Sequence, residues 1–352
     1  MKSRHSIRYS TVAAALLTLA ACGGGNDSTT GTGQLTIGLT DGPVESAESV
    51  VVAFTGIQLK SAGEGAPMDP ITFDENSCDN FDAATNSCYI DLLQLTGDTR
   101  KVVFNEAIEA GHYQWVRLLV DADLDEIDSY IEIKDENESI TMCSLWIPSG
   151  DKTGLKIVGG MTVTANGVSD YTLDFDVRSS VTAPPGLGMG SVEACAQNYI
   201  LKPAIRIVDS TEVGTIAGTV PVPDPASATA SPLSDDSCVM DATTGQYENV
   251  AVYIFENFDR KAVADDIDED MDNANPVTTA SVIFDVDANA YAYEAGFLVA
   301  PEDYLVALTC TADVDMPDSN EFDPTDPNLQ NFSFIAERGV TTVVGATVDG
   351  SF

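Results

Sequence analysis

The feature that most constrains the fold is a series of short segments in which apolar residues alternate with polar or small ones. The first begins at Gln34, after which Leu35, Ile37 and Leu39 are separated by single polar or small residues. Successive side chains of a β-strand point to opposite sides, so a period of two predicts a strand with one buried face. An Asp41-Gly42-Pro43 turn then interrupts the segment.

Similar segments recur along almost the whole chain, with turn residues between them. The segments 50–54 and 57–60 together predict the second strand. The other predicted strands are 35–40, 115–120, 130–133, 140–146, 155–158, 161–164, 171–177, 199–208, 214–220, 250–255, 280–284, 291–297, 304–310, 332–336 and 341–348. Only Ile90–Leu95 and Asn105–Ala110 could be short helices. Asn166-Gly167, between two of the strands, predicts a tight hairpin turn. Many short strands at this spacing predict an all-β fold.

The strand pattern divides into two parts. We predict a β-rich domain over 34–212 and a second β-sandwich domain over 213–352, the latter with about seven strands. A loop rich in proline, alanine and serine, Pro221–Pro232, follows the first strand of the second domain. Hydrophobic residues make up 44% of the chain, which is enough for two cores and argues against global disorder. The predicted fold class is therefore all-β, with two β-sandwich domains.

The N-terminus has the zones of an export signal. Three basic residues precede a short apolar run, Val12–Ala21, which is too short for a permanent membrane-spanning helix of ~20 residues. Leu19-Ala20-Ala21-Cys22 resembles the lipobox of bacterial lipoproteins at every position. The resemblance implies cleavage after residue 21 and lipid attachment to the Cys22 thiol; the alternative is an ordinary signal peptide (1–21) with a chance cysteine. Gly23, in place of an aspartate, favours the outer membrane as the destination.

Residues 22–33 are predicted to be a flexible tether, because they are mostly glycine, serine, threonine and asparagine. A coil of that length spans ~18 Å. We therefore expect a lipid-anchored protein of the cell envelope whose globular part lies close to the membrane.

The cysteine count supports this interpretation. The chain has seven cysteines, and lipidation of Cys22 leaves an even number, which in an exported protein predicts disulfides. Cys238 and Cys310 are the only two in the second domain and must pair if the domains fold separately. The remaining four allow three connectivities, of which we favour Cys78–Cys88 and Cys143–Cys195. Zinc is not expected, because no CxxC spacing or histidine cluster accompanies the cysteines.

The charge of the chain excludes one class of partner. Asp and Glu number 56 against 16 Lys and Arg, a formal net charge of −40. Such a surface repels nucleic acid and anionic headgroups and favours solubility and cation binding. We expect no nucleic-acid partner. The expected partners are the membrane, through the lipid on Cys22, and an unidentified surface protein or glycan.

Both domains show resemblances to known families. The blocks "GQLTIGLTDGPVESAESVVVAFTGIQLK", "EAGHYQWVRLLVDAD", "WIPSGDKTGLKIVGG", "YTLDFDVRSSV" and "YILKPAIRIVD" resemble the domain-of-unknown-function family 4382. That resemblance implies an exported β domain and no particular reaction. The second domain is similar to prealbumin-like sandwiches, including carboxypeptidase regulatory-like domains, through Gly214–Val220, Val252–Phe255 and Tyr291–Leu308. Its Pro301-Glu302-Asp303-Tyr304 lacks the glycine usual in such domains. Their typical role is that of a spacer or binding module.

One acidic segment is a candidate metal site. Asp121, Asp123, Asp125 and Glu132 occupy positions 1, 3, 5 and 12 of a calcium loop, and carboxylate oxygens at that spacing suit Ca²⁺. Glu126 replaces the glycine that such loops need at position 6, and flanking helices are not predicted. The alternative is a solvated acidic loop between strands. A second segment, Asp285–Asn289, lacks the final carboxylate and predicts a hairpin turn.

No catalytic signature stands out. His112 is the one histidine after the signal peptide, and no nucleophile motif accompanies it, so a structural role is expected. Asp174 and Asp176 share a strand face with Arg178, near Lys202 and Arg206. Such carboxylates could serve a glycosidase, or they could form an internal ion-pair network, which is the preferred interpretation.

We therefore predict a lipid-anchored, disulfide-bonded envelope protein that acts as a binding or structural module and is not an enzyme. The alternatives are a surface glycan hydrolase using Asp174 or Asp176, and a calcium-stabilised envelope spacer. No cofactor is expected apart from the candidate Ca²⁺.

Overall fold

The structure is a computed structural model that describes residues 31–352 apart from 43–46, 125, 135–138, 149–152, 185–186, 188–189, 203, 228–229, 243, 257–275 and 315–331. The lipobox and most of the predicted tether lie outside the described residues. No helix in the described part is both long and apolar enough to cross a membrane.

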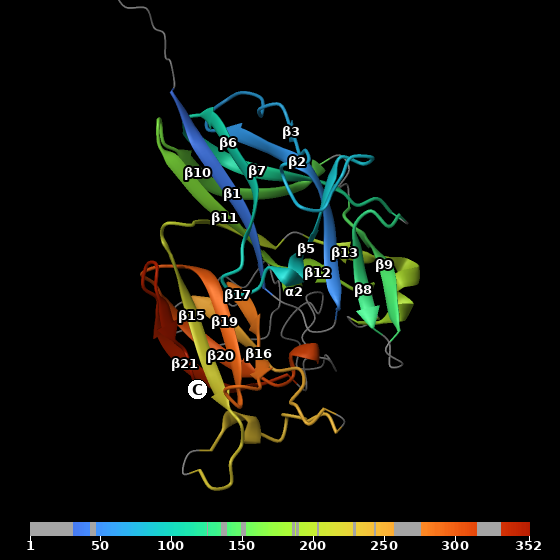
Figure 1. The fold of residues 1–352 in the computed structure, drawn as a ribbon, viewed down its shortest axis with the longest axis vertical. Coiled ribbons are helices and arrows are strands. Elements are labelled where there is room, and N and C mark those ends of the chain that lie inside the picture. The colour runs from blue at the N-terminus through green and yellow to red at the C-terminus, as the bar shows by residue number, and fades with distance from the viewer. Residues whose placement is uncertain are drawn as a thin grey trace, which may run out of the picture.

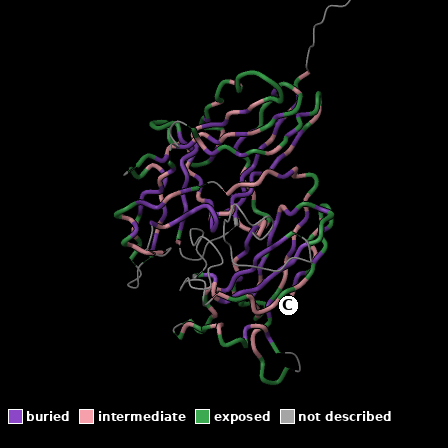
Figure 2. Tube along the Cα trace, turned by 180° about the vertical axis from the view of Figure 1, so that it is seen from behind, coloured by how far each residue is buried: buried purple, intermediate pink, exposed green. Residues whose placement is uncertain are grey.

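The described part is built almost entirely of strands in two β-sandwiches, stacked along the long axis of the molecule (Figure 1). This confirms the predicted all-β fold class. Buried segments run through the middle of both sandwiches, and exposed segments lie mainly at their loops (Figure 2).

The first sandwich pairs a four-stranded sheet with a ten-stranded one. The four-stranded sheet has the order β14-β11-β1-β6, from β1 (Thr32–Gly42), β6 (Lys101–Glu109), β11 (Val168–Asp176) and β14 (Ile205–Asp209). The ten-stranded sheet contains β2 (Ser49–Ser61), β3 (Ile71–Thr72), β4 (Phe81–Asp82), β5 (Ser87–Asp91), β7 (Gly111–Asp121), β8 (Tyr130–Lys134), β9 (Ile140–Trp146), β10 (Leu155–Val163), β12 (Val181–Thr182) and β13 (Tyr199–Leu201). The helical turns of the first sandwich are η1 (Leu92–Gln94), α2 (Val177–Ser180) and η2 (Val192–Gln197).

Strand alternation places the first core as expected. Leu35, Ile37 and Leu39 on β1 are fully buried between the two sheets, together with Leu173 and Phe175 on the neighbouring β11. The intervening residues of both strands point away from this core. β1 begins at Thr32, inside the predicted tether, because its first residues pair with Ile108 and Glu109 of β6.

The segments 50–54 and 57–60 form one strand, β2, as predicted. Two other local predictions differ from the structure. Residues 105–109 belong to β6 and are not a helix, because they pair with β1. Asn166-Gly167 is a tight turn, with φ of 55° at Asn166, but it is not a hairpin. It joins β10 of one sheet to β11 of the other, so the turn carries the chain across the sandwich.

The second sandwich contains two four-stranded sheets in the described part. One has the order β18-β19-β15-β22, from β15 (Val213–Pro221), β18 (Ile283–Asp285), β19 (Ala290–Val299) and β22 (Thr347–Asp349). The other has the order β17-β16-β20-β21, from β16 (Ala251–Glu256), β17 (Thr278–Ser281), β20 (Asp303–Thr309) and β21 (Phe334–Thr341), with the short turns η3 (Pro232–Ser234) and η4 (Ala312–Val314). The hairpin predicted at Asp285–Asn289 is present between β18 and β19, and Asp285 Oδ1 accepts hydrogen bonds from Asp287 N and Ala288 N at 2.8 and 3.1 Å.

The three predicted disulfides are all present. Cys78–Cys88 closes a polar loop beside β5, Cys143–Cys195 ties β9 to η2, and Cys238–Cys310 lies in the second sandwich. None of them crosses between the two sandwiches. The two sandwiches are therefore joined by the chain between β14 and β15 and by non-covalent contacts alone.

Candidate functional site

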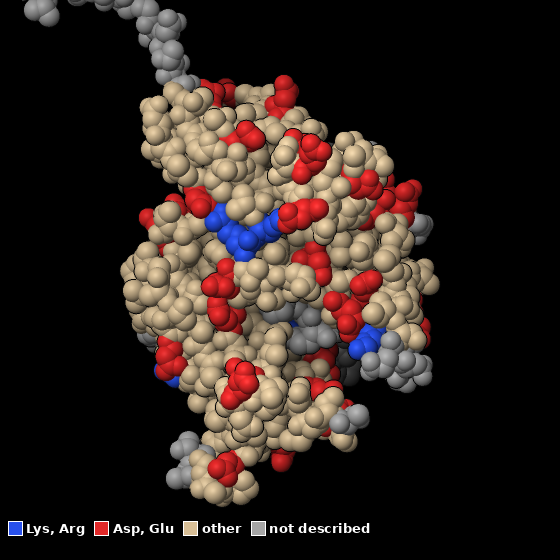
Figure 3. Space-filling view, viewed as in Figure 1, with Lys and Arg blue, Asp and Glu red and all other residues tan. Residues whose placement is uncertain are grey.

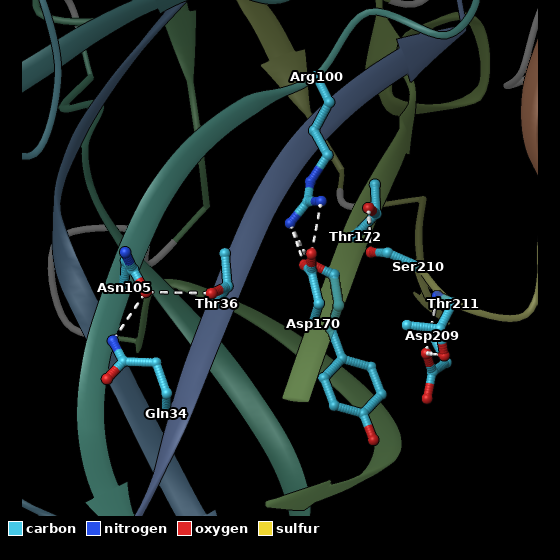
Figure 4. Close-up of polar contacts among 10 residues, drawn as sticks. Gln34, Thr36, Arg100, Asn105, Asp170, Thr172, Asp209, Ser210 and Thr211 are labelled. Atoms are coloured by element: carbon cyan, nitrogen blue, oxygen red, sulfur yellow. Dashed lines mark hydrogen bonds and ion pairs between the residues drawn. The ribbon is translucent and has the colours of Figure 1, made fainter. Parts of the chain in front are cut away.

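The outer face of the four-stranded sheet carries polar side chains that form hydrogen bonds and ion pairs with one another. Asn105 Oδ1 accepts hydrogen bonds from Gln34 Nε2 at 2.7 Å and from Thr36 Oγ1 at 3.1 Å, across β6 and β1 (Figure 4). Arg100 lies across Gly38, where a side chain would collide with it, and forms an ion pair with Asp170 of β11. On this side of the molecule the largest group of basic side chains lies over β1 and β11, with acidic side chains beside it, and a smaller basic group lies apart at the lower right (Figure 3).

Further along the same face, the two candidate catalytic carboxylates have structural partners. Asp174 on β11 pairs in register with Arg206 on β14, whose Nε donates a hydrogen bond to Asp174 Oδ2 at 2.7 Å. The Asp174 side chain is only 5% exposed. Asp176 follows at the end of β11 and caps α2, because its carboxylate accepts hydrogen bonds from Ser179 N at 3.2 Å and Ser179 Oγ at 2.7 Å. This is the internal network that the sequence favoured over a glycosidase pair.

A third buried carboxyl group, Asp41, joins this region and was missed in the sequence. It lies at the end of β1 on the core side, next to Phe175, and is 4% exposed. Asp41 Oδ1 accepts a hydrogen bond from Val177 N at 3.2 Å, and Oδ2 has no hydrogen-bond partner among the described residues. Burial raises the pKa of Asp41 well above its ordinary value, and the charges of Asp174 and Asp176 raise it further.

Burial also raises the pKa of the other two carboxyl groups. For Asp174 the positive charge of Arg206 and its hydrogen bond partly oppose the effect of burial. For Asp176 the hydrogen bonds from Ser179 oppose it, and the charge of Arg178 does so to a smaller extent. Raised carboxyl pKa values occur at active sites and in structural networks alike. Neither Asp174 nor Asp176 lines either of the two cavities described below.

Arg178 connects this network to the second sandwich. Its side chain leaves α2, is 4% exposed, and its Nη1 donates a hydrogen bond to the carbonyl oxygen of Ala312 at 2.9 Å. The guanidinium carbon lies 5.6 Å from the ring centroid of Tyr253 on β16. Tyr253 belongs to an aromatic cluster with Phe255 and Phe334 on the outer face of its sheet. An arginine from one domain is thus inserted against aromatic rings of the other.

A cavity of about 560 Å³ lies elsewhere along the same junction and receives side chains from both sandwiches. Its acidic lining residues are Glu48 and Asp98 from the first domain and Glu294 from the second. Burial and the charge of Asp98 raise the pKa of Glu294. The backbones are close here, since a side chain on Gly296 would lie 2.4 Å from the carbonyl oxygen of Gly97. A smaller cavity of about 330 Å³ lies in the first domain and includes Asp74 and Glu106.

The structure brings together part of the predicted calcium loop. One carboxylate oxygen each of Asp121, Asp123 and Asp128 lies within 4.8 Å of the others, between β7 and β8. Asp128 was not among the predicted ligands, although it lies in the same acidic run. Glu132 is not in this group: it sits on β8 and accepts a hydrogen bond from Ser49 Oγ at 2.8 Å. Asp125 lies outside the described residues.

Three oxygens that converge in this way could hold a hard cation such as Ca²⁺. Burial raises the pKa of Asp121, and the charges of Asp128 and Asp123 raise it further. The flanking elements are strands, so the site is not a helix-loop-helix motif. His112 is exposed, with its Nδ1 3.3 Å from Thr162 Oγ1.

Residues 32–203 match the family model described as a domain of unknown function (DUF4382). This covers the first sandwich up to β13 and agrees with the resemblance noted in the sequence. The match does not extend to the second sandwich, so its similarity to prealbumin-like domains stays a prediction. No curated protein matches the chain.

Among solved structures, the chain is similar to a leucine-rich repeat protein from Bacteroides thetaiotaomicron (10% identity, 91% of this chain and 26% of that one, TM-score 0.22). Others are the Bacillus anthracis TIE protein (8% identity, 92% and 34%, TM-score 0.17) and the minor pilin GBS52 of Streptococcus agalactiae (12% identity, 91% and 94%, TM-score 0.18). The chain spans about a quarter and about a third of the length of the first two. TM-scores this low do not establish a common fold.

Proposed function

We propose that this chain is a lipid-anchored protein of the cell envelope that acts as a binding or structural module rather than as an enzyme. The lipobox at Cys22 supports the anchor, and the short tether would hold the first sandwich close to the membrane. The outer membrane is the destination that Gly23 favours. The mechanism is presentation: two sandwiches, fixed to each other at a buried junction, hold their surfaces in a defined orientation.

The proposal that the protein is not an enzyme rests on the contacts that Asp174 and Asp176 make. A retaining or inverting glycosidase needs one carboxyl group as acid and another as base or nucleophile, both facing bound sugar. Here Asp174 is paired with Arg206, and Asp176 caps α2 beside Ser179. Both carboxyl groups therefore make structural contacts within the first sandwich.

The anchor is tested by labelling cells that express the full chain with a radioactive fatty acid. We expect the wild-type protein to be labelled and to fractionate with the outer membrane, and the Cys22→Ala variant to remain unlabelled. Equal labelling of the two proteins contradicts the anchor. The Cys78→Ala variant is the matched control, because it also removes one cysteine but leaves the lipobox intact.

The hydrolase alternative is tested with the same purified protein. We expect no release of reducing ends from a panel of neutral and acidic polysaccharides. Release by the wild type that disappears in the Asp174→Asn variant, with an unchanged melting temperature, would establish the enzyme and refute the module.

A calcium-stabilised spacer is the second candidate function, and the convergence of Asp121, Asp123 and Asp128 favours it. Cation binding at this loop would fix the connection between β7 and β8. It is compatible with the binding role, since a bound ion stabilises only the folded state.

A further inference from the structure

One face of the ten-stranded sheet gathers basic residues around a tryptophan. On the outer side of β10, β7 and β2, Lys156 pairs in register with Arg117, and Val158 and Lys60 both pair with Trp115. Gln58 pairs with Arg117 from the other side. We call these six residues the Trp115 face: Gln58, Lys60, Trp115, Arg117, Lys156 and Val158. Lys156 and Val158 are exposed, the latter by 76%, and the other four residues are partly exposed.

The three cations of the Trp115 face make no ion pair with any residue that the structure describes. Lys60 Nζ donates hydrogen bonds to the carbonyl oxygens of Ser61 and Gly63 at 2.6 and 2.9 Å. Arg117 Nη1 donates to Gln58 Oε1 at 3.0 Å. Lys156 is exposed and contacts the Trp115 ring. Every hydrogen-bond acceptor in this group is therefore neutral.

This differs from five other basic residues of the described part, which form ion pairs. Arg100, Lys101 and Arg206, on or beside the four-stranded sheet, pair with Asp170, Asp79 and Asp174 respectively. The chain has 56 acidic residues for 16 basic ones, so carboxylate partners are abundant. Two like charges directly opposite each other, as Lys156 and Arg117 are, destabilise a sheet. Two opposed cations with no carboxylate partner among the described residues point to an external partner of opposite charge.

Trp115 holds two of these cations in place. The guanidinium carbon of Arg117 lies 4.9 Å from the ring centroid and Lys156 Nζ lies 5.1 Å from it. Cation–π contacts at this distance are attractive, so the charges stay over the sheet instead of extending into solvent. Side chains that are ordered before binding lose less conformational entropy when a ligand arrives.

We propose that the Trp115 face is a binding site for an anionic polysaccharide, a linear chain of sugars that carry carboxylate or sulfate groups. Lys60, Arg117 and Lys156 would pair with successive anionic groups along the chain, and Gln58 would offer its amide to hydroxyl groups. Trp115 is the positioning residue that sets two of the three charges. The inference deepens the proposed binding role and rests on it.

A thin polymer suits this face better than an extended anionic surface does. The Debye length at physiological ionic strength is about 8 Å, so a narrow chain lying on the patch is screened from acidic groups farther away. An anionic membrane, or a second copy of this chain, would bring many negative charges against a protein of net charge −40. The charge complementarity is therefore local and fits a ligand of small width.

The proposal is tested by affinity electrophoresis of the full mature protein in neutral detergent. Gels contain polygalacturonate, dextran sulfate or neutral dextran, and the two anionic probes distinguish carboxylate from sulfate recognition. We expect at least one anionic polymer to retard the wild type while dextran does not. The Arg117→Gln/Lys156→Gln double variant should weaken that binding at least ~10-fold, which corresponds to about 1.4 kcal/mol.

Three further variants make the result specific. Lys101→Gln/Arg338→Gln removes the same number of charges from residues that pair with Asp79 and Asp349, so we expect its affinity to stay within ~2-fold of the wild type. Trp115→Ala should weaken binding and Trp115→Phe should restore most of it, because phenylalanine also attracts cations. Circular dichroism and melting temperatures confirm that each variant is folded.

Three outcomes overturn the proposal. They are no retardation by either anionic polymer, an equal loss in the control double variant, and binding only to phosphatidylglycerol vesicles, which would make the face a membrane contact. The Cys22 labelling test fails or succeeds independently, since binding in detergent does not require an acylated N-terminus. A negative labelling result therefore contradicts only the lipid anchor, and a negative electrophoresis result contradicts only the polysaccharide site.

Discussion

Arg178 offers the sharpest test of how the two sandwiches are held together. Its guanidinium is buried between the domains, donates a hydrogen bond to Ala312 O at 2.9 Å and lies 5.6 Å from the Tyr253 centroid. No disulfide crosses this junction among those described. We predict that Arg178→Ala weakens the coupling of the two domains more than any other single change at the junction.

The magnitude follows from the contacts. A hydrogen bond to a charged donor contributes about 1.5–3 kcal/mol, and a desolvated cation–π contact about 2 kcal/mol. Removing a buried guanidinium also relieves part of its desolvation cost, which offsets some of this loss. We expect a net loss of about 3 kcal/mol. For domains of this size that lowers the melting temperature by roughly 6–12 °C.

The assay is differential scanning calorimetry with urea denaturation of the same samples. The wild type should unfold in one transition that includes both domains, and Arg178→Ala should split it into two. Arg178→Lys keeps the charge near Tyr253 but loses the planar fork, so it should fall between them. Arg100→Ala is the matched control: it removes an arginine from the partly exposed pair with Asp170 and should cost less than about 1 kcal/mol. The reasoning is refuted if the unfolding free energy of Arg178→Ala lies within about 0.5 kcal/mol of the wild-type value. That threshold is about a third of the free energy contributed by one hydrogen bond to a charged group.

Three further predictions concern charge, metal and packing. The pKa of Asp41 is higher in the folded than in the unfolded protein, so its contribution to stability is complete below the unfolded pKa and is lost as the pH rises through the folded pKa. In thermal melts, the stability of Asp41→Asn relative to the wild type should therefore increase from about pH 4 to about pH 8. A stability difference that decreases over this pH range would contradict the prediction. Calcium at ~100 times its dissociation constant should stabilise the wild type by about 2.7 kcal/mol, and an Asp123→Asn/Asp128→Asn variant should show no such rise in melting temperature; no shift of the wild type at millimolar Ca²⁺ removes the calcium hypothesis. Gly296→Ala should cost about 1–3 kcal/mol, because its new methyl group would lie 2.4 Å from Gly97 O. Gly31→Ala is the control, because its methyl group would meet its nearest neighbour, Ala165 Cβ, at an ordinary contact distance of 3.4 Å. An unchanged melting temperature for Gly296→Ala would show that the backbones separate easily there.

Local patterns predicted the strands well because they depend on neighbours in the chain. The alternation at Leu35, Ile37 and Leu39 identifies the buried side of β1, and in the acidic turn at Asp285–Asn289 the Asp285 side chain accepts hydrogen bonds from the turn's own backbone. Asn166-Gly167 shows the limit of such reasoning. Its backbone conformation is the expected one, but which sheet receives the next strand depends on β1, which lies far away in the sequence.

The candidate sites divide in the same way. The acidic run at Asp121–Asp128 is visible in the sequence, but only the folded loop selects Asp128 and excludes Glu132, which turns towards Ser49. The Trp115 face could not be predicted, because Lys60, Trp115 and Lys156 come from three separate strands. Their common face depends on the register of β2, β7 and β10 and on its irregularities.

The all-β class, the even number of cysteines available for disulfides and the excess of negative charge could be read from the sequence. They follow from composition and from a period of two residues, which the chain carries locally. The structure then selected Cys78–Cys88 and Cys143–Cys195 among the three possible connectivities. Only the tertiary structure decided which polar groups meet: Asp174 with Arg206, Asp41 with Val177, and Arg178 with Ala312 of the other sandwich. The reason is physical, since burial and long-range pairing arise from the packing of segments whose separation in the sequence carries no periodic signal.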